Sequence, residues 1–135
     1  MRHIVNEHGL SGEIDVDSAG TGGWHTGEPP HTGTRKRLTQ AGISYDGIYA
    51  RKLSREDIAK FDYIIGMDSE NLRDIRSYCS QGTSSKTHLL ADFVPDCSWK
   101  SGKDVPDPWY TGDFDETFEL VHEGCEQLLA YLTRK

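Results

Sequence analysis

The chain has 135 residues, a formal net charge of −7 at pH 7 and an isoelectric point near 5.3. This length fits one domain, which we assign to residues 1–135, and the negative charge argues against DNA, RNA or an anionic membrane as the main partner. No apolar run is long enough to cross a bilayer. Cys79, Cys97 and Cys125 are widely spaced, which is more typical of a reducing cytoplasm than of a disulfide framework, so we expect a cytoplasmic protein.

The first elements in chain order are a short helix and a strand. Residues 1–8 are predicted to form a helix with Ile4 and Val5 on its apolar side, although no residue before it can act as an N-cap. Residues 14–17 alternate apolar and polar side chains as a strand does, and they run into the small-residue segment 18–23. Small residues allow a backbone to approach a ligand closely, but such a segment is weak evidence when it stands alone.

The middle of the chain alternates helices and strands. Helices are predicted over residues 33–41 and 54–60, the second opened by a capping box, and Ser69 can cap a further helix. Residues 63–67 form a continuous apolar run typical of a strand covered on both faces, and residues 88–91 predict a last strand. Strands that alternate with helices imply a parallel, doubly wound sheet, so the predicted fold class is α/β.

The predicted helix at residues 33–41 carries a basic triplet, Arg35, Lys36 and Arg37. Three cations in a row can bind a phosphate group, but they more often form a solvated helix face. We therefore expect all three side chains to point outward into water.

The last predicted helix has the strongest pattern, because its apolar residues recur at steps of three or four. Asp113 precedes it as a natural N-cap. Cys125 lies within the apolar stripe, so we expect a buried thiol rather than a reactive one. His122 and Cys125 could form half of a metal site, but no matching second pair exists, so no metal is expected. The stripe consists of Phe114, Phe118, Val121, Cys125, Leu128 and Leu132.

The stretch Asp107–Gly112, with the sequence Asp-Pro-Trp-Tyr-Thr-Gly, combines a carboxylate with two aromatic rings. Pro108 restrains the backbone beside Asp107, and Trp109 and Tyr110 follow directly. A carboxylate on such a stiffened loop suits proton transfer to an aromatic leaving group. A simple Asp-Pro turn with two packing aromatics explains the local sequence at least as well.

Seven stretches together resemble the low-molecular-weight protein-tyrosine phosphatases, the small acid phosphatase family, in order and spacing along essentially the whole chain. The resemblance implies a three-layer fold in which helices flank a four-stranded parallel sheet. It also implies hydrolysis of phosphotyrosine in proteins or small aryl phosphates, through a phosphocysteine and without metal or cofactor. The stretches are Val16–Thr21, Gly27–Pro30, Ala50–Arg51, Phe61–Ile65, Met67–Asp68, Asn71–Asp74 and Asp107–Tyr110.

The resemblance assigns the catalytic acid and the walls of the substrate cleft. Asp107 would protonate the tyrosine leaving oxygen and would later act as base on the water that opens the phosphoenzyme. Trp24, Trp109 and Tyr110 would form the walls that accept the substrate ring, since flat aromatic contacts favour an aryl ester.

The resemblance also assigns two supporting residues. Ser18 would steady the phosphate loop with its hydroxyl, although from the sequence alone a turn bond at a strand end is nearly as good an interpretation. Asp68 would be a supporting carboxylate. The family often places a histidine before its Ala-Arg segment, whereas Ile48 and Tyr49 precede Ala50 here.

The family's nucleophile lies in a loop made of a cysteine, any five residues and an arginine, which we call the cysteine loop. None of Cys79, Cys97 and Cys125 has an arginine six positions further on. We therefore expect that the sequence starts at an internal methionine, behind the first strand and the cysteine loop. The chain alone should be inactive. A positioned general acid accelerates a reaction by only about 10²–10⁴-fold, whereas enzymes accelerate the hydrolysis of phosphate monoesters by up to ~10²¹-fold.

In the family the first strand lies between the strands expected here at residues 14–17 and 63–67. Without that strand the sheet would be incomplete, so we do not expect a stable monomer of the family type. The chain should aggregate, exchange elements with a second copy or re-pair its strands around the gap. Two other functions remain open. A catalytically dead member would bind phosphotyrosine or a protein partner without turnover. A thioredoxin-coupled arsenate reductase shares the fold but needs resolving cysteines close together, and Cys79 has no such neighbour.

Overall fold

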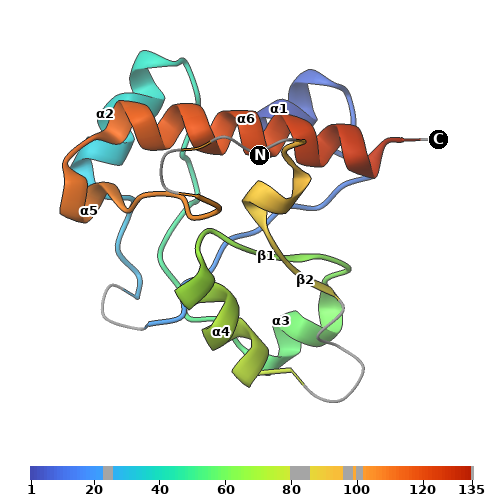
Figure 1. Cartoon of the computed structure of the whole chain (residues 1–135). Coiled ribbons are helices and arrows are strands. Elements are labelled where there is room, and N and C mark those ends of the chain that lie inside the picture. Colours follow the sequence, from blue (N-terminus) through green and yellow to red (C-terminus); the bar gives the residue numbers. More distant parts are fainter. Residues whose placement is uncertain (23–25, 80–85, 96–98, 100–101, 135) are drawn as a thin grey trace.

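The computed structural model describes residues 1–22, 26–79, 86–95, 99 and 102–134 (Figure 1). Helices alternate with short parallel strands, which confirms the α/β class. No helix in these ranges is long and apolar enough to cross a membrane. The elements are α1 (Arg2–Glu7), α2 (Thr32–Gln40), α3 (Arg55–Lys60), β1 (Ile64–Gly66), α4 (Ser69–Ser77), β2 (Thr87–Leu89), the 3₁₀ helix η2 (Leu90–Phe93), α5 (Pro108–Thr111) and α6 (Phe114–Leu132).

The strands β1 and β2 run parallel, with Ile64 opposite Thr87. The predicted strand at 63–67 is confirmed in its centre, but the predicted strand at 88–91 is displaced, because the chain turns into η2 directly after Leu89. The Asp92 carboxylate causes this turn by accepting a hydrogen bond from the amide of Leu89 at 3.0 Å. The side chain of Asp92, three residues after Leu89, thus ends the strand that the apolar pattern predicts to continue.

The predicted strand at residues 14–17 is wrong, because no ladder to it forms in the part of the chain that the structure describes. A strand needs a neighbouring strand for its backbone hydrogen bonds. The alternation of apolar and polar residues does not show whether such a neighbour exists. The alternation still has an effect, since Ile14 and Val16 pack against the apolar cluster between α1 and α6. Sheet-like pairing begins further on, at a parallel bridge between Gly20 and Lys52.

Side-chain caps define where three of the helices begin. The capping box of α3 is confirmed: the Asp57 carboxylate accepts from the amide of Ser54 at 2.9 Å. Asp113 caps α6 as predicted. The N-cap of α4 is Asp68 rather than Ser69, because the Asp68 carboxylate reaches the amide of Asn71 at 2.7 Å. A carboxylate at this position also interacts favourably with the positive end of the helix dipole.

The two strands lie between two layers of helices (Figure 1). On one side α6 crosses α1, α2 and η2, and on the other side α3 and α4 pack against the strands. Ile4, Val5, Cys125 and Leu129 form one apolar cluster, Leu90, Val105 and Leu128 a second, and Ile58, Ile64 and Ile75 a third.

The prediction that the whole basic triplet faces water is wrong for Arg37. Its side chain is 22% exposed, and its Nε atom lies 2.7 Å from Oδ1 of Asp115 on α6. The guanidinium also lies over the ring of Phe118, 4.1 Å from its centre. Arg37 therefore joins α2 to α6, whereas Lys36 stays exposed. Periodicity within α2 could not reveal this, because the attracting groups lie on another helix.

Candidate active site

The backbone before Asp107 is anchored at two points. The amide of Val105 donates to the carbonyl oxygen of Met67, directly after β1, at 2.8 Å. The hydroxyl of Thr117 on α6 donates to the carbonyl oxygen of Pro106 at 2.9 Å. These bonds hold Asp107 at the side of the sheet where β1 ends, the edge at which ligands bind in open parallel α/β sheets.

Asp107 itself begins α5. Its carbonyl oxygen accepts from the amides of Tyr110 at 3.0 Å and Thr111 at 3.2 Å, and Pro108 occupies the first helical position, where a missing N–H costs nothing. Gly112, with φ of 73°, ends the turn. The Asp107 side chain is exposed at the start of this short helix. The carboxylate thus stands on a local structure with little freedom, as a proton donor requires.

Tyr110 is the aromatic residue of α5 whose side chain lies in the described part of the chain. A turn whose aromatics serve only packing would bury them, but Tyr110 is 84% exposed. A ring that makes so little contact with its own chain is available to a ligand. The backbone of Trp109 lies in α5, whereas its side chain and the whole of Trp24 lie outside the described part of the chain.

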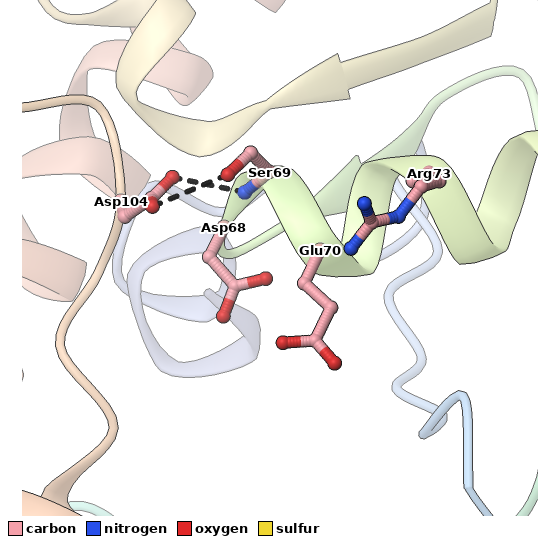
Figure 2. A pocket seen from close by; sticks show the side chains of 5 residues that line it. All are labelled: Asp68, Ser69, Glu70, Arg73 and Asp104. Atoms are coloured by element: carbon pink, nitrogen blue, oxygen red, sulfur yellow. Dashed lines mark hydrogen bonds between the residues drawn. The ribbon is translucent and has the colours of Figure 1, made fainter.

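Asp68 caps α4 and lines a shallow depression of about 360 Å³ (Figure 2). Asp104 comes from the segment that leads to Asp107, and it accepts from the amide of Ser69 at 2.9 Å and from its hydroxyl at 3.3 Å. Figure 2 shows these bonds at the first turn of α4, while the carboxylates of Asp68 and Glu70 project away from them. The depression has three carboxylates and a single arginine, Arg73, so it does not favour a phosphate group.

Ser18 lies on a different segment and is exposed. Its amide donates to Oδ1 of the preceding Asp17 at 2.8 Å. Two residues on, the amide of Gly20 donates to the carbonyl oxygen of Arg51, and the carbonyl oxygen of Gly20 accepts from the amide of Leu53, each at 2.8 Å. The segment that carries Ser18 is therefore held by residues 51–53.

Several of the seven stretches meet in space. The pairing just described joins Val16–Thr21 to Ala50–Arg51. The amide of Gly27 donates to the carbonyl oxygen of Ala50 at 2.7 Å, which adds the stretch Gly27–Pro30 to the same group. The bond from Val105 to Met67 brings the Asp107 segment beside Asp68. The structure thus forms two groups of site residues, one around Ser18 and one around Asp68 and Asp107.

Sequence reasoning missed the connecting role of Arg51. Its Nη1 and Nη2 atoms donate to Oδ2 and Oδ1 of Asp57 at 2.9 and 3.0 Å, and Nη2 also donates to Oδ2 of Asp17 at 3.2 Å. The Arg51 hydrogen bonds, aided by those from Ser54, lower the pKa of Asp57 to about 2 despite its burial. The capping-box spacing had indicated Asp57, but it carries no signal for a partner outside the helix.

The cysteines of the described chain lie in apolar surroundings. Cys125 is 6% exposed and packs with Ile4, Val5 and Leu129, so the predicted buried thiol is confirmed. Cys79 is partly buried against a different cluster, and Cys97 lies outside the described residues. Within the described ranges no group of three or more His, Cys, Asp or Glu residues is arranged to hold a metal ion.

Comparisons with known proteins cover the whole chain. A family model described as low molecular weight phosphotyrosine protein phosphatase matches residues 1–135. The low molecular weight protein-tyrosine-phosphatase YfkJ of Bacillus subtilis is 47% identical over 135 residues, which are 100% of this chain and 85% of that relative. PtpA of Staphylococcus epidermidis, which has the same descriptive name, is 39% identical over 134 residues, with 99% and 82% covered.

Solved structures agree with this result. The crystal structure of YfkJ from Bacillus subtilis matches 98% of this chain and 82% of that chain with a TM-score of 0.93. The crystal structure of DARP, described as drosophila arginine phosphatase, matches with a TM-score of 0.85 at 26% identity, and 99% of this chain and 86% of that chain are covered. The three-layer α/β fold is therefore shared with proteins of more than one named substrate.

Proposed function

The chain belongs to the low molecular weight phosphotyrosine protein phosphatase family, and on that premise we propose that it supplies the general acid and the aromatic cleft of a protein-tyrosine phosphatase. The observation that carries the proposal is the exposed Tyr110 on α5, the short helix that the exposed Asp107 begins. A carboxylic acid and a free ring face at one anchored position suit an aryl phosphate better than a serine phosphate, which has no ring to place.

In the proposed mechanism a cysteine thiolate attacks phosphorus, an S–P bond forms and the P–O bond to the tyrosine ring breaks. Asp107 gives its proton to the leaving phenolic oxygen. Water then attacks phosphorus, the S–P bond breaks, and Asp107 takes the proton of the water, which releases inorganic phosphate and restores the acid. Ser18 would steady the phosphate-binding loop, and Asp68 would support the site from the start of α4.

The thiolate in this scheme belongs to a cysteine loop, and none of the cysteines of these 135 residues has the required arginine. We therefore expect no turnover from the chain alone. Phosphotyrosine proteins or small aryl phosphates are the proposed substrates, without metal or cofactor. A cytoplasmic location fits the described cysteines, since Cys79 and Cys125 are both free thiols.

A chimera tests the proposal directly. The chain is joined to the part of the Bacillus subtilis relative that lies outside the matched region. That part is first checked for a cysteine loop. We expect hydrolysis of p-nitrophenyl phosphate and of a phosphotyrosine peptide, little hydrolysis of a phosphoserine peptide, and none by the chain alone. Preferred hydrolysis of a phosphoarginine peptide would contradict the proposal and favour the activity named for the Drosophila protein.

The two alternative functions are distinguished by the same experiment. A catalytically dead module would bind the phosphotyrosine peptide without turnover, even in the chimera. An arsenate reductase would need two cysteines that can reach each other, but Cys79 and Cys125 lie in different apolar clusters on opposite sides of the strands. The described structure therefore offers this redox chemistry no cysteine pair.

Replacing both Trp24 and Trp109 with alanine is expected to raise the KM for phosphotyrosine peptides in the chimera. Each ring contact contributes about 0.5–1.5 kcal/mol beyond area burial, and loss of the rings should leave the binding of inorganic phosphate unchanged. The KM and the inhibition constant of phosphate are measured together. Trp99→Ala is the matched control, because that indole packs against the cluster around Leu90. Equal weakening of phosphate inhibition would mean that the rings shape the anion site.

A free strand edge supports the proposed self-association. In the described part of the chain β1 pairs only with β2, so one edge of β1 offers backbone groups to a second copy.

We expect sedimentation equilibrium of the chain to give a mean mass that rises above 15.2 kDa as the protein concentration increases. The physical reason is the pairing of exposed strand edges between copies. A single species of monomer mass at every concentration would contradict this expectation.

A further inference from the structure

The carboxylate of Asp57 is the fixed point of a polar network beside the Ser18 segment. Asp57 is 9% exposed, and both of its oxygens accept hydrogen bonds. Oδ2 accepts from the amide of Ser54 at 2.9 Å, from its hydroxyl at 3.1 Å and from Nη1 of Arg51 at 2.9 Å, while Oδ1 accepts from Nη2 of Arg51 at 3.0 Å. The network thus ties Arg51 to the first turn of α3 in a bidentate geometry.

Arg51 holds the Ser18 segment with both its side chain and its backbone. Nη2 donates to Oδ2 of Asp17 at 3.2 Å, and the other oxygen of Asp17 accepts the amide of Ser18 at 2.8 Å. The carbonyl oxygen of Arg51 accepts the amide of Gly20 at 2.8 Å. Asp17, before Ser18, and Gly20, after it, are therefore both hydrogen-bonded to Arg51, and these bonds set the position of Ser18.

The exposed fractions of the side chains show which of the two ion pairs fixes the position of Arg51. The ion pair between Arg51 and Asp17 is about as exposed as a surface pair, with 36% and 46% of the side chains accessible, so alone it contributes little. Asp57 has only 12% of its side chain accessible, and its bonds to Arg51 are bidentate and charge-assisted. The buried pair with Asp57 fixes the guanidinium of Arg51, and the exposed pair then orients Asp17 and Ser18.

We propose that Arg51 is a positioning residue which, held by Asp57, orients Asp17 and the Ser18 hydroxyl for the phosphate-binding loop. The proposal rests on the proposed function in giving Ser18 that role. Lysine cannot replace arginine fully here, because a single ammonium lacks the planar fork that meets both oxygens of Asp57 while it also reaches Asp17.

Hydrogen exchange of the chain itself tests the positioning without any catalytic assay. In Arg51→Gln we expect the amides of Ser18 and Gly20 to exchange at least about tenfold faster, with a smaller effect in Arg51→Lys. Asp17→Asn breaks only the exposed pair and leaves Oδ1 as an acceptor, so it should speed exchange at Ser18 without lowering the melting temperature. Lys52→Gln, which changes an exposed neighbouring side chain, is the matched control.

Two exchange results would overturn the proposal. One is faster exchange confined to α3, with the amides of Ser18 and Gly20 unchanged, since that result describes a cap for the helix alone. The other is unchanged exchange at Ser18 in Asp17→Asn. This second variant keeps the proposal testable even if Arg51→Gln unfolds the chain.

Kinetics of the chimera then test the link to Ser18. Arg51→Gln should lower kcat by about tenfold with a smaller change in KM, and Arg51→Lys should recover part of the loss. Adding Ser18→Ala to Arg51→Gln should cost little more, because both changes remove one interaction. Fully additive losses would overturn the proposal. An inactive chimera would refute the proposed function, while the exchange data would still decide whether Arg51 positions Ser18.

Discussion

Replacing Asp107 with asparagine is expected to lower the turnover of phosphate esters with poor leaving groups by about 10²–10³-fold in the chimera. An asparagine has the shape of the carboxylic acid but cannot give a proton to the phenolic oxygen as the P–O bond breaks. The Asp107 side chain is exposed at the start of α5, so the variant should fold normally. Turnover of phenyl phosphate and of esters of more acidic phenols is measured in parallel.

The leaving-group series separates acid catalysis from a structural effect. Esters of strongly acidic phenols need little protonation, so their turnover should fall much less in Asp107→Asn. Asp113→Asn is the matched control, because it makes the same chemical change nearby while asparagine remains a good N-cap for α6. Equal losses for every leaving group would mean that Asp107 only supports the structure.

The contact of α6 with η2 leads to a second expectation, on stability. Gly124 lies within α6, and a Cβ atom there would come within 2.6 Å of Cγ of Leu90, which is 1% exposed. Gly124→Ala should therefore lower the free energy of unfolding by about 1–3 kcal/mol through overpacking, offset by up to about 1 kcal/mol of gained helix propensity. Leu90→Ala should lower it by about 2–5 kcal/mol, because it leaves a cavity.

The double variant tests whether these two residues share one space. In Gly124→Ala with Leu90→Ala, the new methyl group enters the space that the leucine leaves. The combined loss should then be smaller than the sum of the single losses by about 0.5–3 kcal/mol. Urea unfolding is followed at one protein concentration, since the proposed self-association would make stability depend on concentration. Gly12→Ala, with nothing within 4 Å of the new Cβ, is the control, and strict additivity would contradict the packing argument.

Helices and their ends were determined largely by the sequence itself. The capping box of α3 and the Asp113 cap were predicted and are present. Of the predicted stripe of α6, Val121, Cys125, Leu128 and Leu132 pack into the apolar clusters, which also include Leu129, a residue outside the predicted stripe. The physical reason is that caps and helix periodicity depend on residues three or four positions apart, which are adjacent in any helix. The one misplaced cap, Ser69 for Asp68, is a choice between neighbours that both offer an oxygen.

The family could also be identified from the sequence, but the arrangement of the site could not. Residues 14–17 have the pattern of a strand and are not one in the described structure, because a strand depends on a neighbour elsewhere in the chain. Arg37 turns toward Asp115 because that carboxylate lies on another helix, which the sequence pattern of α2 does not reveal. The exposure of Tyr110 also depends on how α5 lies against the rest of the chain, which the local sequence does not determine.

The network around Ser18 shows this dependence most clearly. Arg51 meets Asp57 six residues further on and Asp17 thirty-four residues back, and only the folded chain brings the two carboxylates to one guanidinium. Local spacing predicts a contact only where the backbone repeats, as in a helix turn. Between separate segments, the backbone pairing of residues 20 and 51–53 decides which charges meet, and that pairing is a property of the tertiary structure.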